Sequence, residues 1–185
     1  MAKIVVVGLG YVGMSCAVLL AQHNEVVGVD TSLERVSLVN KNKSPIVDND
    51  ISQYLAEKNL SLIASMDLKS ALVGADFLII STPTDYDPET NSFDTSSVEE
   101  IIGSVMVLCP DLLIIIKSTI PVGFVDRIRQ HFQSNNIVFC PEFLREGRGL
   151  YDNLHPSRIV VGDKSPRAER FAQLLKNAAI KKDVR

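Results

Sequence analysis

Three glycines near the N-terminus are spaced as in loops that bind nucleotide phosphates. Gly8, Gly10 and Gly13 form the pattern G-x-G-x-x-G, which follows an apolar run, Lys3 to Val7, and opens a stretch with helical spacing. In such a loop the first glycine permits a tight turn, the second lets the backbone approach a pyrophosphate, and the third lets the helix pack closely on the sheet. The helix N-terminus adds free N–H groups and positive potential. The pattern predicts a dinucleotide site.

An acidic residue distinguishes between the two nicotinamide dinucleotides. Asp30 ends the second apolar run, 22 residues after Gly8, close to the roughly 20 expected of a carboxylate that binds the adenosine ribose. A carboxylate there repels a 2′-phosphate, so NAD is favoured over NADP. Arg35 could stack on adenine, meet a phosphate or lie on the helix surface. An ordinary strand-to-helix turn is the alternative for the glycines, but Asp30 favours the nucleotide.

Hydroxyl groups follow two later predicted strands. Ser81-Thr82-Pro83-Thr84 follows one strand, and the stretch Lys117 to Gly123 follows the next. Open α/β sheets bind ligands at the carboxyl ends of their strands. Thr84 and Thr119 are therefore candidate cofactor contacts, with helix caps and X-Pro turns as the alternative.

Two glutamates follow another apolar strand. Glu142 and Glu146 are four residues apart in the stretch Pro141 to Gly147, so they would share one face if the stretch were helical. A carboxylate at a ligand-binding edge can position or deprotonate a water molecule. Alternatively, the two are solvated side chains with Arg145 as counter-ion, and the residues alone leave both interpretations open.

The elements that would position these residues alternate along the chain. Apolar runs predict strands at 3–7, 25–30, 61–64, 75–81, 112–117, 137–140 and 158–162. Helical patterns occupy 11–23, 32–40, 51–57, a short stretch after Asp67, 95–108, 123–132 and 166–177. Thr95 or Ser96 could cap the fifth helix, with Glu99 completing a capping box. This alternation predicts an α/β fold, a doubly wound and mostly parallel sheet.

Composition excludes several classes of protein. The chain has 185 residues, of which 46% are hydrophobic and 22% charged, which is typical of a folded domain rather than a disordered one. With 19 basic and 22 acidic residues, it has no broad cationic surface for nucleic acid. Its apolar runs are far shorter than the roughly 20 residues that span a bilayer, and no signal peptide begins the chain. We expect a cytoplasmic protein without membrane or nucleic-acid partners.

No metal site is indicated. The acidic loop at 84–94 begins like a calcium loop, but Thr90 stands where glycine is needed and Ser96 where the bidentate glutamate belongs. The cysteines are odd in number and lack C-x-x-C spacing, so neither a disulfide framework nor a zinc site is indicated. They are Cys16, Cys109 and Cys140.

Six motifs follow one another in a characteristic order. They are G-L-G-Y-V-G at 8–13, S-P-I-V-D at 44–48, T-P-T-D-Y-D-P at 82–88, K-S-T-I-P-V-G at 117–123, P-E-F-L-R-E-G at 141–147 and N-L-H-P-S-R at 153–158. Over essentially its whole length the chain resembles the UDP-glucose 6-dehydrogenases of the UDP-glucose/GDP-mannose dehydrogenase family. Related UDP-sugar and GDP-mannose enzymes share the glycine loop, K-S-T-x-P-x-G and P-E. The T-P-T-D-Y-D-P and F-L-R-E-G motifs are more typical of the UDP-glucose branch.

The resemblance implies oxidation of UDP-glucose to UDP-glucuronate by two NAD molecules, through a cysteine-linked thiohemiacetal and thioester. Thr119 would support the water or oxyanion network near the sugar C6, Glu146 would be the general base on the hydrolytic water, and Glu142 would assist. The implied NAD contacts are Gly8, Gly10, Tyr11, Val12, Gly13, Asp30, Arg35, Thr84 and Thr119. The nucleotide-sugar would be held, partly through the backbone, by Phe143, Leu144, Arg145 and Glu146.

By the same resemblance, residues 1–177 would be one NAD-binding domain with substrate-facing loops, and 178–185 would lead toward a central helix and a second half. The family's nucleophilic cysteine lies in that second half, so we expect no turnover by this chain alone. Cys140 is the one tempting substitute, although structural packing is the favoured interpretation. Full-length members would be homodimers. The alternatives are an NAD-binding module without turnover, or the N-terminal half of a related UDP-sugar dehydrogenase, for example one acting on UDP-N-acetylmannosamine.

Overall fold

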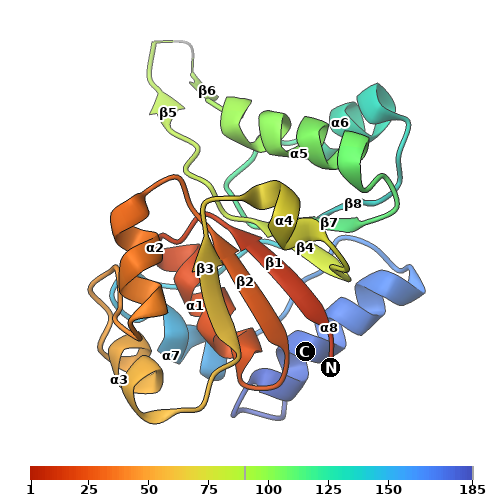
Figure 1. Cartoon of the computed structure of the whole chain (residues 1–185). Coiled ribbons are helices and arrows are strands. Elements are labelled where there is room, and N and C mark those ends of the chain that lie inside the picture. The colour runs from red at the N-terminus through yellow and green to blue at the C-terminus, as the bar shows by residue number, and fades with distance from the viewer. Residues whose placement is uncertain (90, 185) are drawn as a thin grey trace.

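A parallel sheet of six strands organises the computed structural model, which describes residues 1–89 and 91–184 (Figure 1). The strands run in the order β3-β2-β1-β4-β7-β8. They are β1 (Lys3–Val7), β2 (Glu25–Val29), β3 (Leu62–Ser65), β4 (Phe77–Ile80), β7 (Leu113–Ile116) and β8 (Ile137–Phe139). The chain builds outward from β1 to one edge, then crosses back to β4 and builds toward the other. The predicted doubly wound α/β sheet is confirmed, with its switch point between β1 and β4.

Helices cover both faces of this sheet because successive strand residues point to opposite sides. Ile4 and Val6 of β1 pack into one apolar cluster with α1, α2, α3, α7 and α8, whereas Val5 and Val7 pack into another with α4, α5 and α6. The helices are α1 (Tyr11–Ala21), α2 (Leu33–Asn40), α3 (Asn49–Glu57), α4 (Leu68–Leu72), α5 (Ser96–Leu108), α6 (Phe124–Phe132), α7 (Gly149–Leu154) and α8 (Pro166–Ala178).

The prediction of a strand at 158–162 is wrong. Gly162 N donates to Phe139 O at 2.8 Å, so this segment runs beside β8, yet it has no strand structure. Because β8 is only three residues long, it offers little edge for a further strand to pair with. The following helix α8 begins at Pro166 after its cap Ser165, as the sequence predicts.

The predicted capping box at α5 is also wrong. Thr95 is the N-cap residue but makes no side-chain cap hydrogen bond; its Oγ1 instead donates to Glu99 Oε1 at 2.8 Å. The N–H of Ser96 is bound by Asp94 Oδ1 at 2.9 Å. A carboxylate just upstream has therefore taken the role expected of a hydroxyl.

Three short elements were not predicted. A hairpin of β5 (Tyr86–Asp87) and β6 (Ser92–Phe93) projects from the body of the fold, within the predicted acidic loop (Figure 1). The third is α7, which packs between α1 and α3 and binds the C-terminal tail, since the N–H groups of Ile180 and Lys181 both donate to Leu154 O. Thr90 of the loop and Arg185 of the tail lie outside the described residues. Among the described residues, no helix is long and apolar enough to cross a membrane.

Candidate nucleotide site

A hollow of about 840 Å³ opens at the carboxyl ends of the strands, where the strand order reverses between β1 and β4. Its walls come from the segments that follow β1, β2, β4 and β7, which are far apart in the sequence. The predicted residues that line it are Gly8, Gly10, Tyr11, Val12, Asp30, Arg35, Thr84, Thr119 and Glu146. The structure thus brings the predicted cofactor contacts together at the switch point, with one exception, Gly13.

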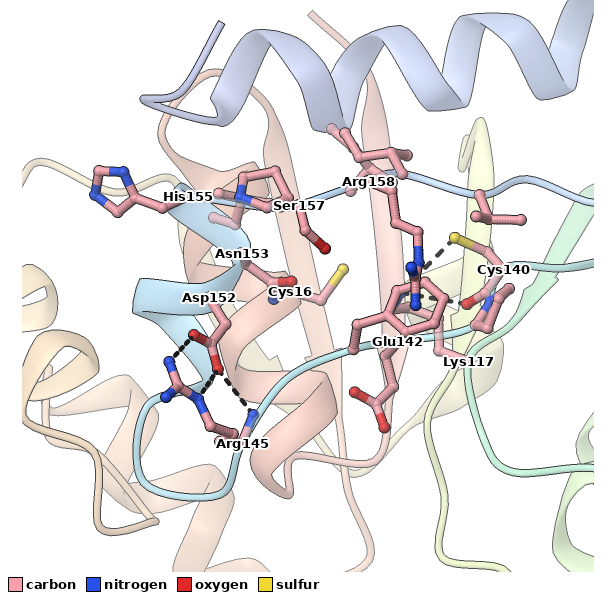
Figure 2. A pocket seen from close by; sticks show the side chains of 17 residues that line it. Cys16, Lys117, Cys140, Glu142, Arg145, Asp152, Asn153, His155, Ser157 and Arg158 are labelled. Atoms are coloured by element: carbon pink, nitrogen blue, oxygen red, sulfur yellow. Dashed lines mark hydrogen bonds and ion pairs between the residues drawn. The ribbon is translucent and has the colours of Figure 1, made fainter. Parts of the chain in front are cut away.

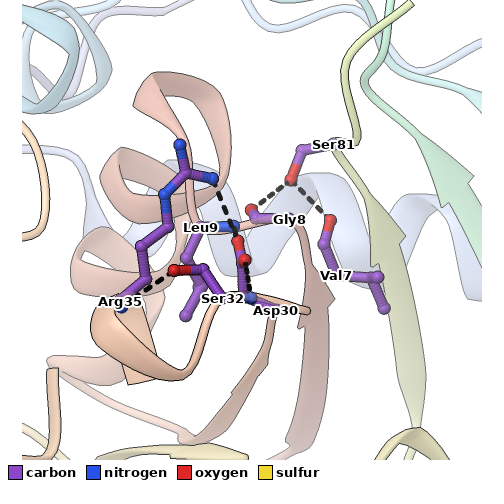
Figure 3. Close-up of polar contacts among 7 residues, drawn as sticks. All are labelled: Val7, Gly8, Leu9, Asp30, Ser32, Arg35 and Ser81. Carbon is purple, nitrogen blue, oxygen red and sulfur yellow. Dashed lines mark hydrogen bonds and ion pairs between the residues drawn. The ribbon is translucent and has the colours of Figure 1, made fainter. Parts of the chain in front are cut away.

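Gly13 lies beneath the loop rather than on the wall of the hollow. A Cβ atom at this position would lie 1.7 Å from Gly8 O and 2.6 Å from Ser81 Oγ, so only glycine lets α1 approach the sheet so closely. Ser81 Oγ donates to Val7 O and Gly8 O, both at 2.9 Å (Figure 3). One hydroxyl therefore joins the end of β4 to the start of the glycine loop.

Asp30 holds the glycine loop as well as facing the hollow. Its Oδ2 accepts the N–H of Leu9 at 2.7 Å and lies 3.3 Å from Arg35 Nη1, while Oδ1 accepts the N–H of Ser32 at 2.8 Å (Figure 3). The carboxylate is only 6% exposed. A carboxylate can accept about four hydrogen bonds, so these contacts leave room for a ribose hydroxyl. Arg35, whose role the sequence left open, is paired with Asp30.

The start of α1 is suited to an anion. Gly10 is the N-cap residue and makes no side-chain cap hydrogen bond, and the first turn of α1 contains no acidic residue. The N–H groups of that turn are therefore available to an outside acceptor. A Cβ atom at Gly10 would meet nothing within 4 Å, which leaves space for a phosphate against the backbone. The residues present fit a dinucleotide pyrophosphate.

Hydroxyl groups join the two loops that follow β4 and β7. Ser118 Oγ donates to Thr82 O at 2.7 Å, and Ser97 Oγ of α5 donates to Thr82 Oγ1 at 3.0 Å and to Pro83 O at 3.1 Å. This network fixes the loops that carry Thr84 and Thr119 at the hollow. The sequence did not identify the α5 residues that also line the hollow, which are Ser97, Glu100, Ile101 and Ser104. These residues are three or four positions apart, so they share one face of α5. That spacing could have identified them if the helix had first been placed beside the site.

The two glutamates of the P-E-F-L-R-E-G stretch face different hollows. Residues 141–147 are not helical, so the condition for a shared face is not met. Glu146 is exposed on the wall of the hollow described above. Glu142 lines a second, smaller hollow of about 260 Å³, and its Oε2 accepts the N–H of Leu144 at 3.0 Å. The segment between the two glutamates is irregular and ends in a turn, so the two carboxylates do not lie together on one face.

Only some of the predicted substrate residues line the second hollow, which Figure 2 shows. Phe143 and Arg145 line it, Glu146 lines the larger hollow, and Leu144 is not among the residues that line either. The Arg158 guanidinium lies 4.0 Å from the centre of the Phe143 ring, a cation–π contact. Arg145 binds Asp152 at 2.6 Å, and this bond lowers the pKa of the Asp152 carboxyl.

Two cysteines are buried in the wall of the second hollow. Burial raises the pKa of Cys16 to about 11, and it raises the pKa of Cys140 even though the Lys117 ammonium acts in the opposite direction. Lys117 Nζ donates to Cys140 O at 3.3 Å and lies 3.7 Å from Cys140 Sγ. Buried thiols with raised pKa values are poor nucleophiles. The environment of Cys140 agrees with structural packing.

Comparison with known proteins gives consistent matches along the chain. Residues 2–179 match the family model described as "UDP-glucose/GDP-mannose dehydrogenase family, NAD binding domain". A UDP-glucose 6-dehydrogenase of Streptococcus pneumoniae is 50% identical over 98% of this chain and 48% of its own length. A UDP-glucose 6-dehydrogenase of Campylobacter jejuni is 44% identical over 98% of this chain and 47% of its own length. The chain thus spans about half the length of the curated relatives it matches.

Solved structures of related enzymes superpose on the same region. A UDP-glucose dehydrogenase from Pyrobaculum islandicum has a TM-score of 0.84 and 28% identity over 97% of this chain and 44% of its own. A GDP-mannose dehydrogenase from Pseudomonas aeruginosa has a TM-score of 0.83 and 26% identity over 96% of this chain and 44% of its own. Both matches cover nearly all of this chain and less than half of the solved chain.

Proposed function

Because the chain belongs to the UDP-glucose/GDP-mannose dehydrogenase family and matches its NAD-binding domain, we propose that it is the NAD-binding half of a UDP-glucose 6-dehydrogenase. The family match confirms NAD as the cofactor. One observation carries the proposal: the glycine loop, Asp30, Thr119 and Glu146 line a single hollow at the switch point. The identity to UDP-glucose 6-dehydrogenases supports the choice of UDP-glucose.

In this proposal the chain's own residues bind and orient the cofactor. The N–H groups at the start of α1 hold the pyrophosphate, and Asp30 holds the adenosine ribose. When bound, NAD supplies the hydride acceptor for oxidation at the sugar C6. The buried negative charge of Asp30 disfavours a 2′-phosphate, and Arg35 does not offset this because it is already paired with Asp30. NAD is therefore preferred to NADP.

The same hollow supplies the groups for hydrolysis of the thioester. Glu146 is exposed there and acts as the general base that takes a proton from the attacking water. Thr119, on the loop after β7, orients that water or the developing oxyanion through its hydroxyl. Glu142 faces the other hollow and assists indirectly, because its bond to Leu144 N shapes the loop that carries Glu146. Phe143 and Arg145, which line the second hollow, and Leu144 between them hold the nucleotide-sugar next to the turn that carries Glu146.

The chain alone does not complete this reaction. Oxidation through a thiohemiacetal needs an accessible thiolate, and the two cysteines near the ligand-binding edge are buried with raised pKa values. In this proposal the nucleophile is the cysteine that the resemblance places in the second half of the family's architecture. Steady NADH production from UDP-glucose by the purified 185-residue chain would contradict this part of the proposal.

Calorimetry tests the nucleotide site. We expect the chain to bind NAD more tightly than NADP, and Asp30→Ala to weaken NAD binding on the order of 10-fold while narrowing that preference. Asp76→Ala is a matched control at the opposite end of the sheet, because Asp76 also accepts a backbone N–H, from Lys3 at 2.9 Å, and pairs with an arginine, Arg170 at 3.0 Å. Equal affinities for the two nucleotides, or no binding by a folded sample, would refute the site.

A chimera tests the substrate. Residues 1–185 joined to the remaining half of the Streptococcus pneumoniae relative would restore a complete enzyme. We expect NADH from UDP-glucose and little from UDP-N-acetylmannosamine, with Glu146→Gln in the same chimera slowing turnover by at least about 100-fold. A chimera that prefers UDP-N-acetylmannosamine would favour a related UDP-sugar dehydrogenase instead.

A further inference from the structure

Asp48 ends the S-P-I-V-D motif, and its buried carboxylate contacts two helices. The residue is 2% exposed. Its Oδ1 accepts the N–H of Ile51 at 3.1 Å, which caps the N-terminus of α3. Its Oδ2 accepts the N–H of Leu150 at 3.4 Å, in the first turn of α7 and 102 residues further along the chain. One carboxylate therefore serves the N-termini of two helices.

The helix α7 depends on this distant cap. Its own N-cap residue, Arg148, makes no side-chain cap hydrogen bond. The helix is six residues long, far below the length at which a helix is stable by itself. A buried N–H without an acceptor costs about 1–3 kcal/mol, and Leu150 is fully buried. Asp48 supplies that acceptor, and its negative charge is favourable at both helix N-termini.

The turn that carries Glu146 leads directly into α7. Arg148 N donates to Arg145 O at 3.0 Å, so residues 145–148 form a β-turn with Glu146 in its second position. Gly147, in the third position, has a φ of +77°, a conformation that suits glycine in a type II turn. A Cβ atom there would be 3.6 Å from Val47 O, so the turn lies against the S-P-I-V-D segment.

Both ends of this turn are anchored by carboxylates. At its start, Asp152 of α7 accepts the N–H of Arg145 at 2.9 Å and binds the Arg145 guanidinium at 2.6 Å (Figure 2). Just beyond its end, Asp48 binds Leu150. The place of Glu146 is therefore tied to how firmly α7 is seated, and the Asp48 carboxylate is one of the contacts that seat this helix.

We propose that Asp48 is a positioning residue, which caps α3 and α7 with one carboxylate and thereby fixes Glu146 at the wall of the cofactor hollow. This inference rests on the role proposed above for Glu146. It differs from an ordinary helix cap in a way that can be measured. A residue that caps α3 alone would leave α7 and Glu146 undisturbed when replaced by another good N-cap residue.

Hydrogen exchange of the 185-residue chain separates the two roles. Asp48→Ser keeps one short oxygen, which suits the N-cap of α3 but cannot serve two helices. We expect amide exchange in α7 to accelerate at least about 10-fold, because the free energy of local opening falls there. Exchange in α3 should change less than about 3-fold. Ser165→Ala is the matched control, because it removes the side-chain cap of α8, in which Ser165 Oγ accepts the N–H of Ala168 at 3.3 Å. Unchanged exchange in α7 of Asp48→Ser would overturn the shared cap.

A second variant keeps the test decisive if the serine variant does not fold. Asp48→Asn preserves the size of the side chain but offers one acceptor oxygen where two are used. We expect it to lose protection at Leu150, at Ile51 or at both. Wild-type protection at both amides would overturn the proposal.

The Glu146 carboxyl carbon gives the functional readout by NMR, with Glu146→Gln to assign its signal. We expect this signal to shift when NAD is added to the wild-type chain and to Ser165→Ala, and to shift less than half as far in Asp48→Ser at saturating NAD. A full shift in Asp48→Ser would overturn the positioning role. If the Glu146 signal of the wild-type chain does not shift although NAD is bound, the proposed place of Glu146 is refuted, and so is the role of Asp48 in positioning it. Hydrogen exchange would still decide whether Asp48 caps both helices.

Discussion

Two loops reach the same edge of the sheet by different means. The glycine loop at 8–13 follows β1, and its position is set by close backbone contact and by groups that end neighbouring strands, Asp30 and Ser81. The stretch at 141–147 follows β8, and it is held by carboxylates on or beside helices, Asp48 and Asp152. The first loop is positioned mainly by close backbone packing, together with the Asp30 carboxylate, and the second loop by the carboxylates of Asp48 and Asp152.

The difference has consequences for how each loop can fail. Close backbone packing tolerates no added atom at the point of contact, which in the glycine loop is Gly13. A loop held by carboxylates tolerates changes of side-chain size, but it loosens when those carboxylates are protonated or removed. In this chain the cofactor loop is of the first kind, and the loop with the proposed catalytic base is of the second kind.

The largest effect is expected at Gly13. Gly13→Ala places a Cβ atom 1.7 Å from Gly8 O, a backbone atom that cannot move without displacing the loop. We expect a loss of at least about 3 kcal/mol of unfolding free energy, or no folded protein, measured by thermal and urea unfolding followed by circular dichroism.

Gly10→Ala is the matched variant in the same loop. Its Cβ atom would meet nothing within 4 Å, and its φ of −81° is open to alanine. We therefore expect stability within about 0.5 kcal/mol of the wild type, together with weaker NAD binding because the methyl group occupies space beside the backbone. If both variants were equally stable, the steric account of the first loop would fail.

An intermediate effect is expected at Asp152, the residue of α7 that binds Arg145 at the start of the second loop's turn. The bonds from the Arg145 guanidinium lower the pKa of Asp152 in the folded chain. A lowered pKa contributes stability above the ordinary value near 4, and this stability is lost as the pH falls through the folded value. We expect Asp152→Asn to lower the free energy of unfolding by only about 1 kcal/mol at pH 7, because the arginine is largely exposed. The difference in unfolding free energy between the variant and the wild type should shrink below pH 4.

Urea unfolding of both proteins across this pH range measures the effect. Asp111→Asn, at an exposed loop position, controls for the general consequence of removing one negative charge. A difference between Asp152→Asn and the wild type that persists unchanged at pH 3 would show that packing, rather than charge, anchors the Glu146 turn. The contrast between the two loops would then disappear.

The first loop could be predicted from the sequence and the second could not, for a physical reason. The glycine loop depends on residue types at short spacing and on Asp30, which ends the next strand, so the local pattern contains nearly all of its geometry. The same holds for the strands, whose apolar runs record burial on both faces. The pattern of apolar residues is a local property of the sequence, and the strands of the sheet can be predicted from such local patterns.

The stretch at 141–155 depends on contacts that no local pattern records. The spacing of Glu142 and Glu146 suggests a helix, but the helix begins only at Gly149, and its cap is Asp48, 102 residues from Leu150. The motif S-P-I-V-D was visible in the sequence, yet its partner was not. The hollow lined by Cys140 and Phe143 likewise exists because separate segments meet there.

The smallest effect concerns the thiols behind the second loop. With a pKa of about 11, Cys16 is about one-thousandth ionised at pH 8, and burial raises the pKa of Cys140 as well. Cys109 is partly exposed at the end of α5. We expect Ellman's reagent at pH 8 to label one of the three thiols quickly, Cys109→Ser to abolish that reaction, and urea to release the other two.

Labelling of Cys140 in the folded chain would change the comparison between the loops. It would mean that the segment after β8 opens far enough for a reagent to reach the sheet, although Lys117 ties the end of β7 to the Cys140 carbonyl at 3.3 Å. If Asp48→Ser made Cys140 reactive and Ser165→Ala did not, the loosening would extend from α7 to the strand end. Protection of Cys140 in both variants would confine the effect of Asp48 to α7 and the Glu146 turn, because the strand end is held separately by Lys117 and by the Cys140 N–H, which donates to Ile116 O at 2.9 Å.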